Sequence, residues 1–291
     1  MGNLNSFSKI IAGTMTWGSW GKQLSKMEKI DLMQHCIAEG ITTFDHADIY
    51  GGYTNEADFG DAFAESDISR ENVQFISKCG IQYVCEARNN KVKHYDYSRE
   101  YIIWSAEQSL GHLKTDYLDL FLLHRPSPLM HPEVIAAAVS ELIKAGKIKN
   151  FGVSNFTPSQ IGMLETMIPV KGNQVEFSLT SEKTMYDGTF DDVIAHRRLA
   201  MSWSPLGDYF KEENESNNRI KKVMETLTKK YLATEDQLLL AWILKHPAQV
   251  HPVVGTTNKK RLTNAMNATQ IELELEDWFI LLEANQGHKV P

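Results

Sequence analysis

The chain has 291 residues, of which 42% are hydrophobic and 23% charged, and its formal net charge is −7. This composition is typical of a globular protein, and the acidic balance disfavours nucleic-acid binding, which needs a basic face. No stretch of about 20 apolar residues is present to span a membrane, and we expect no signal peptide. Because the three cysteines cannot all pair, we also expect free thiols and a cytoplasmic location.

Short apolar runs alternate along the chain with stretches that have helical periodicity. The first run covers residues 9–14, and a helix capped by Ser25 follows over residues 26–39. The later expected strands cover residues 41–44, 73–77, 117–123, 148–153, 170–177, 199–203 and 250–254. The later expected helices cover residues 55–63, 98–111, 131–146, 158–167, 191–197, 218–231, 234–245, 259–266 and 275–283.

These elements form eight strand–helix units, with extra helices before the eighth strand and at the C-terminus. Eight such units predict an α/β fold, a (β/α)8 TIM barrel, as a single domain over residues 1–291. A doubly wound sheet is the alternative, because the order of the units does not show whether the sheet closes. The chain has no GxGxxG fingerprint and no P-loop motif, which disfavours an open dinucleotide-binding sheet and excludes a P-loop enzyme.

Polar side chains follow three consecutive strands at the point where each apolar run ends. Asp45 ends the second strand, Lys78 follows the third and His124 the fourth, while Tyr50 comes five residues after Asp45. Functional groups of a TIM barrel stand at the carboxyl ends of its strands, and neighbouring strands lie about 4.8 Å apart. We therefore expect these polar groups to share one mouth of the barrel, where pairing offsets the cost of burying them.

The chain resembles the aldo-keto reductase superfamily, and most closely bacterial NADPH-dependent aldo/keto reductases of unassigned physiological substrate. Beside the four residues above, the resemblance is carried in family order by Gly13-Thr14-Met15, YLDLFLLHRP at 117–126, GKIKNFGVSNF at 146–156, NQVEFS at 173–178, WSPLG at 203–207 and VVGTTNKKRL at 253–262. It implies an oxidoreductase that reduces aldehydes or ketones to alcohols by hydride transfer from NADPH, with NADH as a possible but weaker cofactor.

The resemblance also implies catalytic roles for Tyr50, Asp45, Lys78 and His124. Tyr50 would be the general acid, although a free tyrosine with a pKa of about 10 is a slow acid near neutrality. The Lys78 cation would lower that pKa, and Asp45 would hold Lys78 in place. His124 would donate a hydrogen bond to the carbonyl oxygen of the substrate.

By the same resemblance, a cofactor site follows the later strands. Ser154, Asn155 and Gln174 would bind the carboxamide and Trp203 would stack on the nicotinamide ring, while Arg261 would bind the 2′-phosphate. The remaining expected cofactor contacts, including those to the pyrophosphate and at a helix N-terminus that favours phosphate, are Gly13, Thr14, Met15, Asp45, Ser204, Pro205, Leu206, Gly207, Gly255, Thr256, Thr257, Lys259 and Asn264. Gly255 stands where the family often has a lysine, and Lys259 or Lys260 could compensate.

The expected substrate is a small carbonyl compound, and the expected partners include neither nucleic acid nor membrane. The side chains expected to wall the pocket, which suit hydrophobic aldehydes or ketones, are Trp17, Trp20, Tyr83, Leu129 and Met130. The chain is expected to be a monomer or a small homo-oligomer. Two other functions stay open, a catalytically weak NADP-binding regulatory subunit and a metal-dependent barrel hydrolase that uses Asp45, His46, Asp48 and His124. We interpret His46 instead as a local hydrogen-bonding residue.

Overall fold

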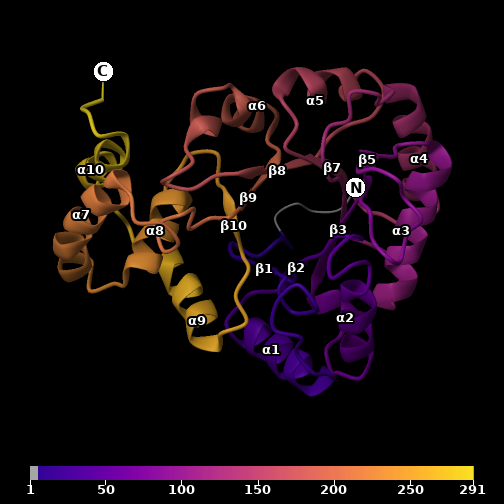
Figure 1. Cartoon of the computed structure of the whole chain (residues 1–291), viewed down its shortest axis with the longest axis horizontal. Coiled ribbons are helices and arrows are strands. Elements are labelled where there is room, and N and C mark those ends of the chain that lie inside the picture. Colours follow the sequence, from indigo (N-terminus) through magenta and orange to yellow (C-terminus); the bar gives the residue numbers. More distant parts are fainter. Residues whose placement is uncertain (1–5, 291) are drawn as a thin grey trace.

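The computed structural model describes residues 6–290, and within this range eight parallel strands close into a barrel (Figure 1). Neighbouring strands follow the order β1, β10, β9, β8, β7, β6, β3, β2, and β2 pairs back with β1. The barrel strands are β1 (Ile11–Gly13), β2 (Thr43–Asp45), β3 (Gln74–Cys79), β6 (Leu120–Leu123), β7 (Phe151–Ser154), β8 (Gly172–Glu176), β9 (Leu199–Trp203) and β10 (His251–Val254). This closure confirms the (β/α)8 prediction over the doubly wound alternative. Residues 1–5 and 291 of the predicted domain lie outside the described residues.

Helices follow the barrel strands and cover the outside of the barrel (Figure 1). Those that come directly after a barrel strand or its loop are α1 (Lys26–Ala38), α2 (Asn55–Ala64), α3 (Arg99–Leu113), α4 (Pro132–Lys144), α5 (Pro158–Glu165), α6 (Thr189–His196), α7 (Glu215–Tyr231) and α9 (Lys259–Asn267). As the sequence predicts, extra helices stand before β10 and near the C-terminus, namely α8 (Glu235–Leu244) and α10 (Leu275–Gln286).

The extra helices form one group at the side of the barrel (Figure 1). Trp242 of α8 and Trp278 of α10 stack with ring centroids 4.8 Å apart and planes only 3° apart. Each indole N–H also donates to the backbone carbonyl of the other tryptophan, at 3.1 and 3.0 Å. The hydrogen bonds satisfy both indole N–H groups while the rings stack, so this pair holds α10 against α8.

Local sequence signals explain where several helices begin. Ser25 caps α1 and forms a reciprocal capping box with Glu28. Thr157 and Gln160 form the same arrangement at α5, where Pro158 occupies the first helical turn. These residues satisfy backbone N–H groups that a helix start leaves unpaired, which is why the starts are readable from the sequence.

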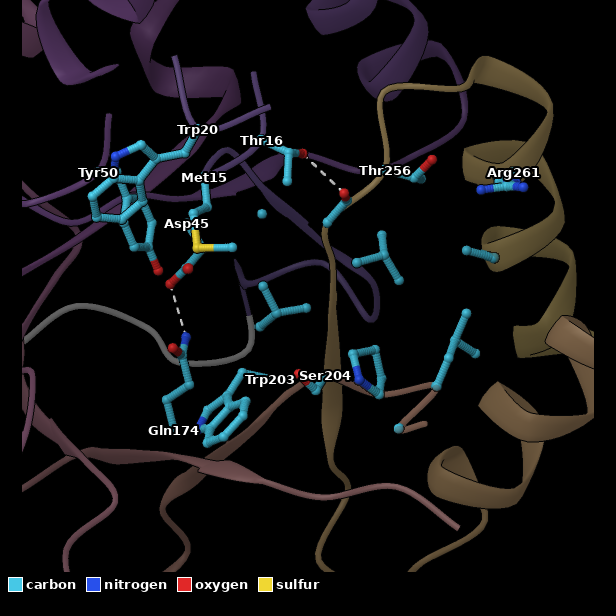
Figure 2. A pocket seen from close by; sticks show the side chains of 18 of the residues that line it. Met15, Thr16, Trp20, Asp45, Tyr50, Gln174, Trp203, Ser204, Thr256 and Arg261 are labelled. Atoms are coloured by element: carbon cyan, nitrogen blue, oxygen red, sulfur yellow. Dashed lines mark hydrogen bonds between the residues drawn. The ribbon is translucent and has the colours of Figure 1, made fainter. Parts of the chain in front are cut away.

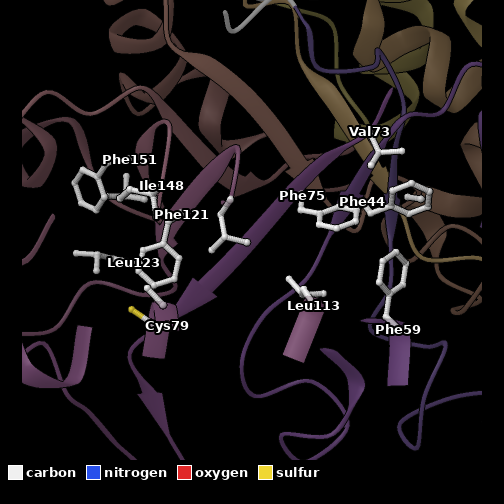
Figure 3. Packing of buried hydrophobic residues seen from close by; sticks show 14 of the residues in the cluster. Phe44, Phe59, Val73, Phe75, Cys79, Leu113, Phe121, Leu123, Ile148 and Phe151 are labelled. Atoms are coloured by element: carbon white, nitrogen blue, oxygen red, sulfur yellow. The ribbon is translucent and has the colours of Figure 1, made fainter. Parts of the chain in front are cut away.

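Side-chain alternation along the strands decides which groups enter the barrel. On β3, Phe75 packs outward against aromatic rings of the surrounding layer, whereas Ile76 belongs to the separate cluster that fills the barrel interior. Phe44 of β2 lies beside Phe75 and beside Phe59 of α2 (Figure 3). Because successive strand residues face opposite sides, Asp45 and Lys78 turn inward at the carboxyl ends of β2 and β3.

The structure differs from the expected elements mainly at strand starts and at one hairpin. Leu118 makes only an isolated bridge with Ile148, so the ladder at β6 and β7 begins later than the apolar runs suggest. A two-stranded hairpin of β4 (Ile81–Gln82) and β5 (His94–Tyr95) follows β3 and is absent from the sequence prediction. Its strands have two residues each, which is too short to show the alternation of apolar and polar side chains that marks a strand. None of the helices in residues 6–290 has the length and apolar character needed to cross a membrane.

Candidate active site

A hydrogen-bonded chain of three side chains stands at the carboxyl ends of β2 and β3. The Nζ of Lys78 donates to Oδ2 of Asp45 at 2.7 Å and to the hydroxyl of Tyr50 at 3.1 Å. It also donates to the backbone carbonyl of His46 at 2.7 Å. The Lys78 side chain is fully buried, and these three acceptors match its three N–H bonds. The structure thus brings Asp45, Lys78 and Tyr50 together in the order that the sequence predicts.

The environment of these groups raises the pKa values of both Tyr50 and Lys78. Burial raises the pKa of Tyr50 above its usual range, and the Lys78 cation acts against this shift. The Lys78 cation therefore lowers the pKa of Tyr50 as expected, but the net shift is upward, because removal from water disfavours the phenolate more than the cation favours it. Burial lowers the pKa of Lys78, but Asp45 and Tyr50 outweigh it and keep the ammonium charged.

His124 lies across the mouth from Tyr50. The two ring centroids are 6.1 Å apart, and the rings meet nearly edge to face. Burial, and then the charges of Lys78, Arg125 and Lys93, hold the pKa of His124 well below its usual value, so the imidazole is neutral. A neutral imidazole still carries one N–H, and His124 lines the same cavity as Tyr50, so it can donate to a bound oxygen.

Further polar contacts hold Asp45 in its position. Gln174 of β8 donates its amide to Oδ1 of Asp45 at 2.8 Å across the barrel (Figure 2). Thr14 is buried, donates to the Asp45 carbonyl at 3.0 Å and lies 2.9 Å from Nδ1 of His46. Gln174 on Oδ1 and Lys78 on Oδ2 thus satisfy both carboxylate oxygens, while Thr14 holds the Asp45 backbone.

His46 and Asp48 turn away from the mouth. The His46 ring packs on Phe59 with centroids 4.4 Å apart, and burial lowers its pKa to about 3. Its bond with Thr14 fits the interpretation as a local hydrogen-bonding residue. Asp48 accepts from Tyr101 and Ser105 on α3, behind the strand layer. In residues 6–290 no group of three or more His, Cys, Asp or Glu side chains is arranged to hold a metal ion, and nothing found here favours the hydrolase alternative.

A cavity of about 1260 Å³ runs from Tyr50 to the start of α9 (Figure 2). This volume exceeds the roughly 300–1,000 Å³ of a typical small-molecule pocket, so the cavity has room for a ligand larger than one small molecule. Most of the expected cofactor contacts line it, namely Gly13, Met15, Asp45, Gln174, Trp203, Ser204, Pro205, Leu206, Gly207, Gly255, Thr256, Arg261 and Asn264. Thr14 does not line it and instead supports Asp45 from behind.

The groups expected at the nicotinamide form a connected network. Trp203 donates its indole N–H to Oδ1 of Asn155 at 2.9 Å, and the Asn155 amide donates to Oγ of Ser154 at 2.7 Å. Neither Ser154 nor Asn155 lines the cavity, whereas Trp203 and Gln174 do. Asn155 keeps a second amide N–H and a second lone pair, so it retains capacity to bind a carboxamide beside Trp203.

Backbone geometry shapes the loops at this end of the strands. Asn155 and Ser204 both have positive φ values, 61° and 51°. Such values are uncommon for residues other than glycine, and strained positions of this kind cluster at binding sites. The turn at Ser204 directs the following residues, through Gly207, along the cavity wall.

Cationic groups gather at the opposite end of the cavity. An adjoining hollow of about 570 Å³ is lined by Arg261 and Lys22. Thr257, in the segment between β10 and α9, also lines it. Lys22 was missed by the sequence reading, since it lies in the loop after β1 and belongs to no motif. Lys259 does not line either space, because it pairs with Asp31 of α1 at 2.6 Å. The structure thus gives no support to the expected cofactor contact of Lys259, whereas Lys260 lines the cavity.

Most of the side chains expected to wall the substrate pocket lie away from the cavity. Only Trp20 lines the cavity. Trp17 is a core residue packed between Phe44 and Phe59, at centroid distances of 6.1 and 5.9 Å. Leu129 is 89% exposed and Met130 packs on the outer core.

Tyr83 stacks on Tyr53 outside the cavity lining. The side chains that wall the pocket instead, and that the sequence reading missed because they come from the unrecognised hairpin and from strand ends, are Ile49, Ile81, Lys93, Tyr95 and Arg125.

Comparison with known proteins identifies related chains. The profile of the aldo/keto reductase family matches residues 9–286. The chain is 41% identical to a Bacillus subtilis (strain 168) protein named uncharacterized oxidoreductase YcsN, with 98% of this chain and 96% of that protein covered. It is 34% identical to a 6-dehydroglucose reductase of Agrobacterium fabrum, with 89% and 88% covered. Among solved structures it is similar to the thermostable aldo-keto reductase Tm1743 in complex with epalrestat, with a TM-score of 0.79, 26% identity, and 95% and 94% covered.

Proposed function

This chain belongs to the aldo/keto reductase family and is an oxidoreductase, and we propose that it reduces aldehydes or ketones to alcohols with NADPH, using Tyr50 as the proton donor. The observation that carries the proposal is the hydrogen-bonded chain from Asp45 through Lys78 to Tyr50, which ends in the cavity opposite His124. A small carbonyl substrate is consistent with the relative named 6-dehydroglucose reductase.

The residues present fit a nicotinamide cofactor. The Trp203 ring faces the cavity beside Gln174, and Gly255 has no heavy atom within 4 Å of the place where a Cβ would stand, which leaves room for a ligand against its backbone. Trp203 and Gln174 would hold the nicotinamide, and the segment from Ser204 to Gly207 would follow the pyrophosphate. When bound, the reduced cofactor supplies a hydride to the carbonyl carbon.

The side chains at the mouth would complete the reduction. His124 donates an N–H to the substrate oxygen and orients it, while the Tyr50 hydroxyl gives that oxygen its proton. Lys78 donates to the phenolic oxygen and stabilises the phenolate that is left, and Asp45 accepts from Lys78 and holds it in position. Because burial raises the pKa of Tyr50, the phenol is protonated at neutral pH and the Lys78 charge matters most as the proton leaves.

The preference for NADPH rests on the cationic end of the cavity. A 2′-phosphate placed in the hollow that Arg261 and Lys22 share would meet two cations and the N-terminus of α9. Lys22 can thereby supply the second cation that is missing at Gly255. NADH would leave both cations without an anion there.

A panel of aldehydes and ketones with NADPH, followed by loss of reduced-nicotinamide absorbance, tests the function. We expect turnover by the wild type and a loss of about 10²-fold or more in Tyr50→Phe, which removes the proton donor and keeps the ring. NADPH affinity, measured by fluorescence titration, should change little. Near-normal turnover in Tyr50→Phe would remove Tyr50 from this role, and no turnover of any carbonyl by the wild type would contradict the proposed function.

A further inference from the structure

Two cations outside the catalytic set face the substrate end of the cavity. Arg125 follows His124 directly, and Lys93 precedes β5 of the hairpin that follows β3. Both line the same cavity as Tyr50, His124 and Tyr95. Both charges also contribute to the lowered pKa of His124, so both act at the reacting end.

The guanidinium of Arg125 is held against the wall but has unused donors. Its Nη1 donates to the backbone carbonyl of His124 at 3.2 Å and to Oγ of Ser154 at 3.3 Å, and its Cζ lies 5.4 Å from the centre of the Trp203 ring. Among residues 6–290, no acidic side chain lies within ion-pair distance of Arg125 or Lys93, and the other guanidinium nitrogens of Arg125 have no hydrogen-bond partner. Arg125 is only half-exposed, so part of its hydration is lost without an anion in return.

The acids near this end do not neutralise these cations. Asp45 is already bound by Lys78 and Gln174. Glu176 acts on Arg125 from an exposed position at the end of β8. Asp236 also lines the cavity, but it lies on α8, which packs against α9 at the Arg261 side. The substrate end therefore has an excess of positive charge.

We propose that Arg125 and Lys93 form an anion subsite, and that the favoured substrates are aldehydes or ketones that carry a carboxylate. The inference rests on the proposed function, because it concerns the compound reduced at Tyr50. A guanidinium offers two parallel N–H donors that match a carboxylate, while an exposed ammonium attracts it from solvent. The aromatic walls of Trp20 and Tyr95 would hold the carbon skeleton between the anion and the carbonyl.

The test compares two aldehydes that differ in charge, 4-formylbenzoate and its methyl ester, with NADPH. We expect kcat/KM to favour the acid by roughly tenfold to a hundredfold, the range for a charge-assisted contact. The ratio should fall as salt rises, since Lys93 is exposed. In Arg125→Gln the ratio should drop by about tenfold or more, and in Lys93→Gln by about two- to fivefold.

Lys91→Gln is the matched control, because Lys91 is exposed on the same hairpin and does not line the cavity. Its acid-to-ester ratio should equal that of the wild type. Because Arg125 also contacts Ser154, its replacement can disturb the fold, and the exposed Lys93→Gln variant then decides the question. Equal constants for acid and ester in the wild type, or a ratio unchanged in Lys93→Gln and Arg125→Gln, would overturn the anion subsite while leaving the reductase function intact. Reduction of neither aldehyde, nor of any carbonyl in the wider panel, would overturn the proposed function and this inference with it.

Discussion

The cavity has a Tyr50 end and an Arg261 end (Figure 2), and a lysine–aspartate pair stands in a different setting near each. At the Tyr50 end, the side chains of Lys78 and Asp45 are 0% and 3% exposed, and each bonds to further polar groups. Beside the Arg261 end, the paired side chains of Lys259 and Asp31 are 44% and 64% exposed. Water competes for the second pair and is excluded from the first. The comparison teaches that a buried ion pair is strongly coupled to the groups around it, whereas an exposed pair contributes little.

The largest effect is expected from Lys78→Met. The variant should lose about 10²-fold or more of kcat, because Tyr50 no longer has a cation to stabilise its phenolate. It should also lose about 3–5 kcal/mol of unfolding free energy, since Asp45 stays buried without its partner. Single-turnover assays and urea unfolding measure the two effects. Wild-type rates in a folded variant would show that the buried chain is structural rather than catalytic.

A smaller effect is expected at the exposed end from Arg261→Ala. The wild type should prefer NADPH over NADH by roughly tenfold to a hundredfold in KM, and the variant should lose most of this preference. Raising salt should weaken the preference in the wild type, because Arg261 is exposed. Steady-state KM for both cofactors gives the answer. Equal wild-type constants, or a preference that survives the substitution, would contradict a 2′-phosphate site at Arg261.

The unfolding free energy is also expected to depend on pH through a carboxyl group that is buried near Lys78. Glu56 of α2 is 3% exposed and accepts from Ser77 on the outer side of β3, and burial raises its pKa from 4.5 to about 7. Between these values the folded state keeps a proton that the unfolded state releases, so stability falls as pH rises through this window. In Glu56→Gln, the unfolding free energy should fall less between pH 5 and 8 than in the wild type, by an amount on the order of 1–3 kcal/mol.

Urea unfolding of Glu56→Gln and the wild type at both pH values measures the difference. Asp48, whose pKa burial raises to about 7, remains in the variant and keeps part of the slope. Glu65→Gln is the control, since Glu65 lies at the end of the same helix with its side chain 60% exposed. An unchanged slope in Glu56→Gln would mean that this carboxyl is ionised in the folded protein.

The smallest effect is expected from Lys259→Gln. Loss of its exposed ion pair with Asp31 should change the unfolding free energy by no more than about 1 kcal/mol. Its NADPH preference should match the wild type, in contrast to Arg261→Ala. A large loss of preference would place Lys259 at the cofactor and contradict the pairing in the structure.

Much of the fold was readable from the sequence because the signals are local. The capping boxes that begin at Ser25 and Thr157 each lie within a four-residue segment, so the sequence around them is enough to mark a helix start. Strand starts were less readable, since Leu118 is as apolar as the residues that follow it but has only one bridging partner. The hairpin of β4 and β5 was missed because two-residue strands carry no period, and the true pocket walls Lys93 and Tyr95 were missed with it.

The sequence by itself determined the number of strand–helix units and the inward direction of Asp45 and Lys78, because alternation along a strand is a property of neighbouring residues. Only the tertiary structure decided which of two adjacent lysines faces the cavity. Lys259 pairs with a carboxylate on α1, a residue far away in the chain, and so leaves the site to Lys260. Likewise Trp17 became a core residue and Trp20 a pocket wall, because the packing against Phe44 and Phe59 depends on how the closed barrel meets its helices.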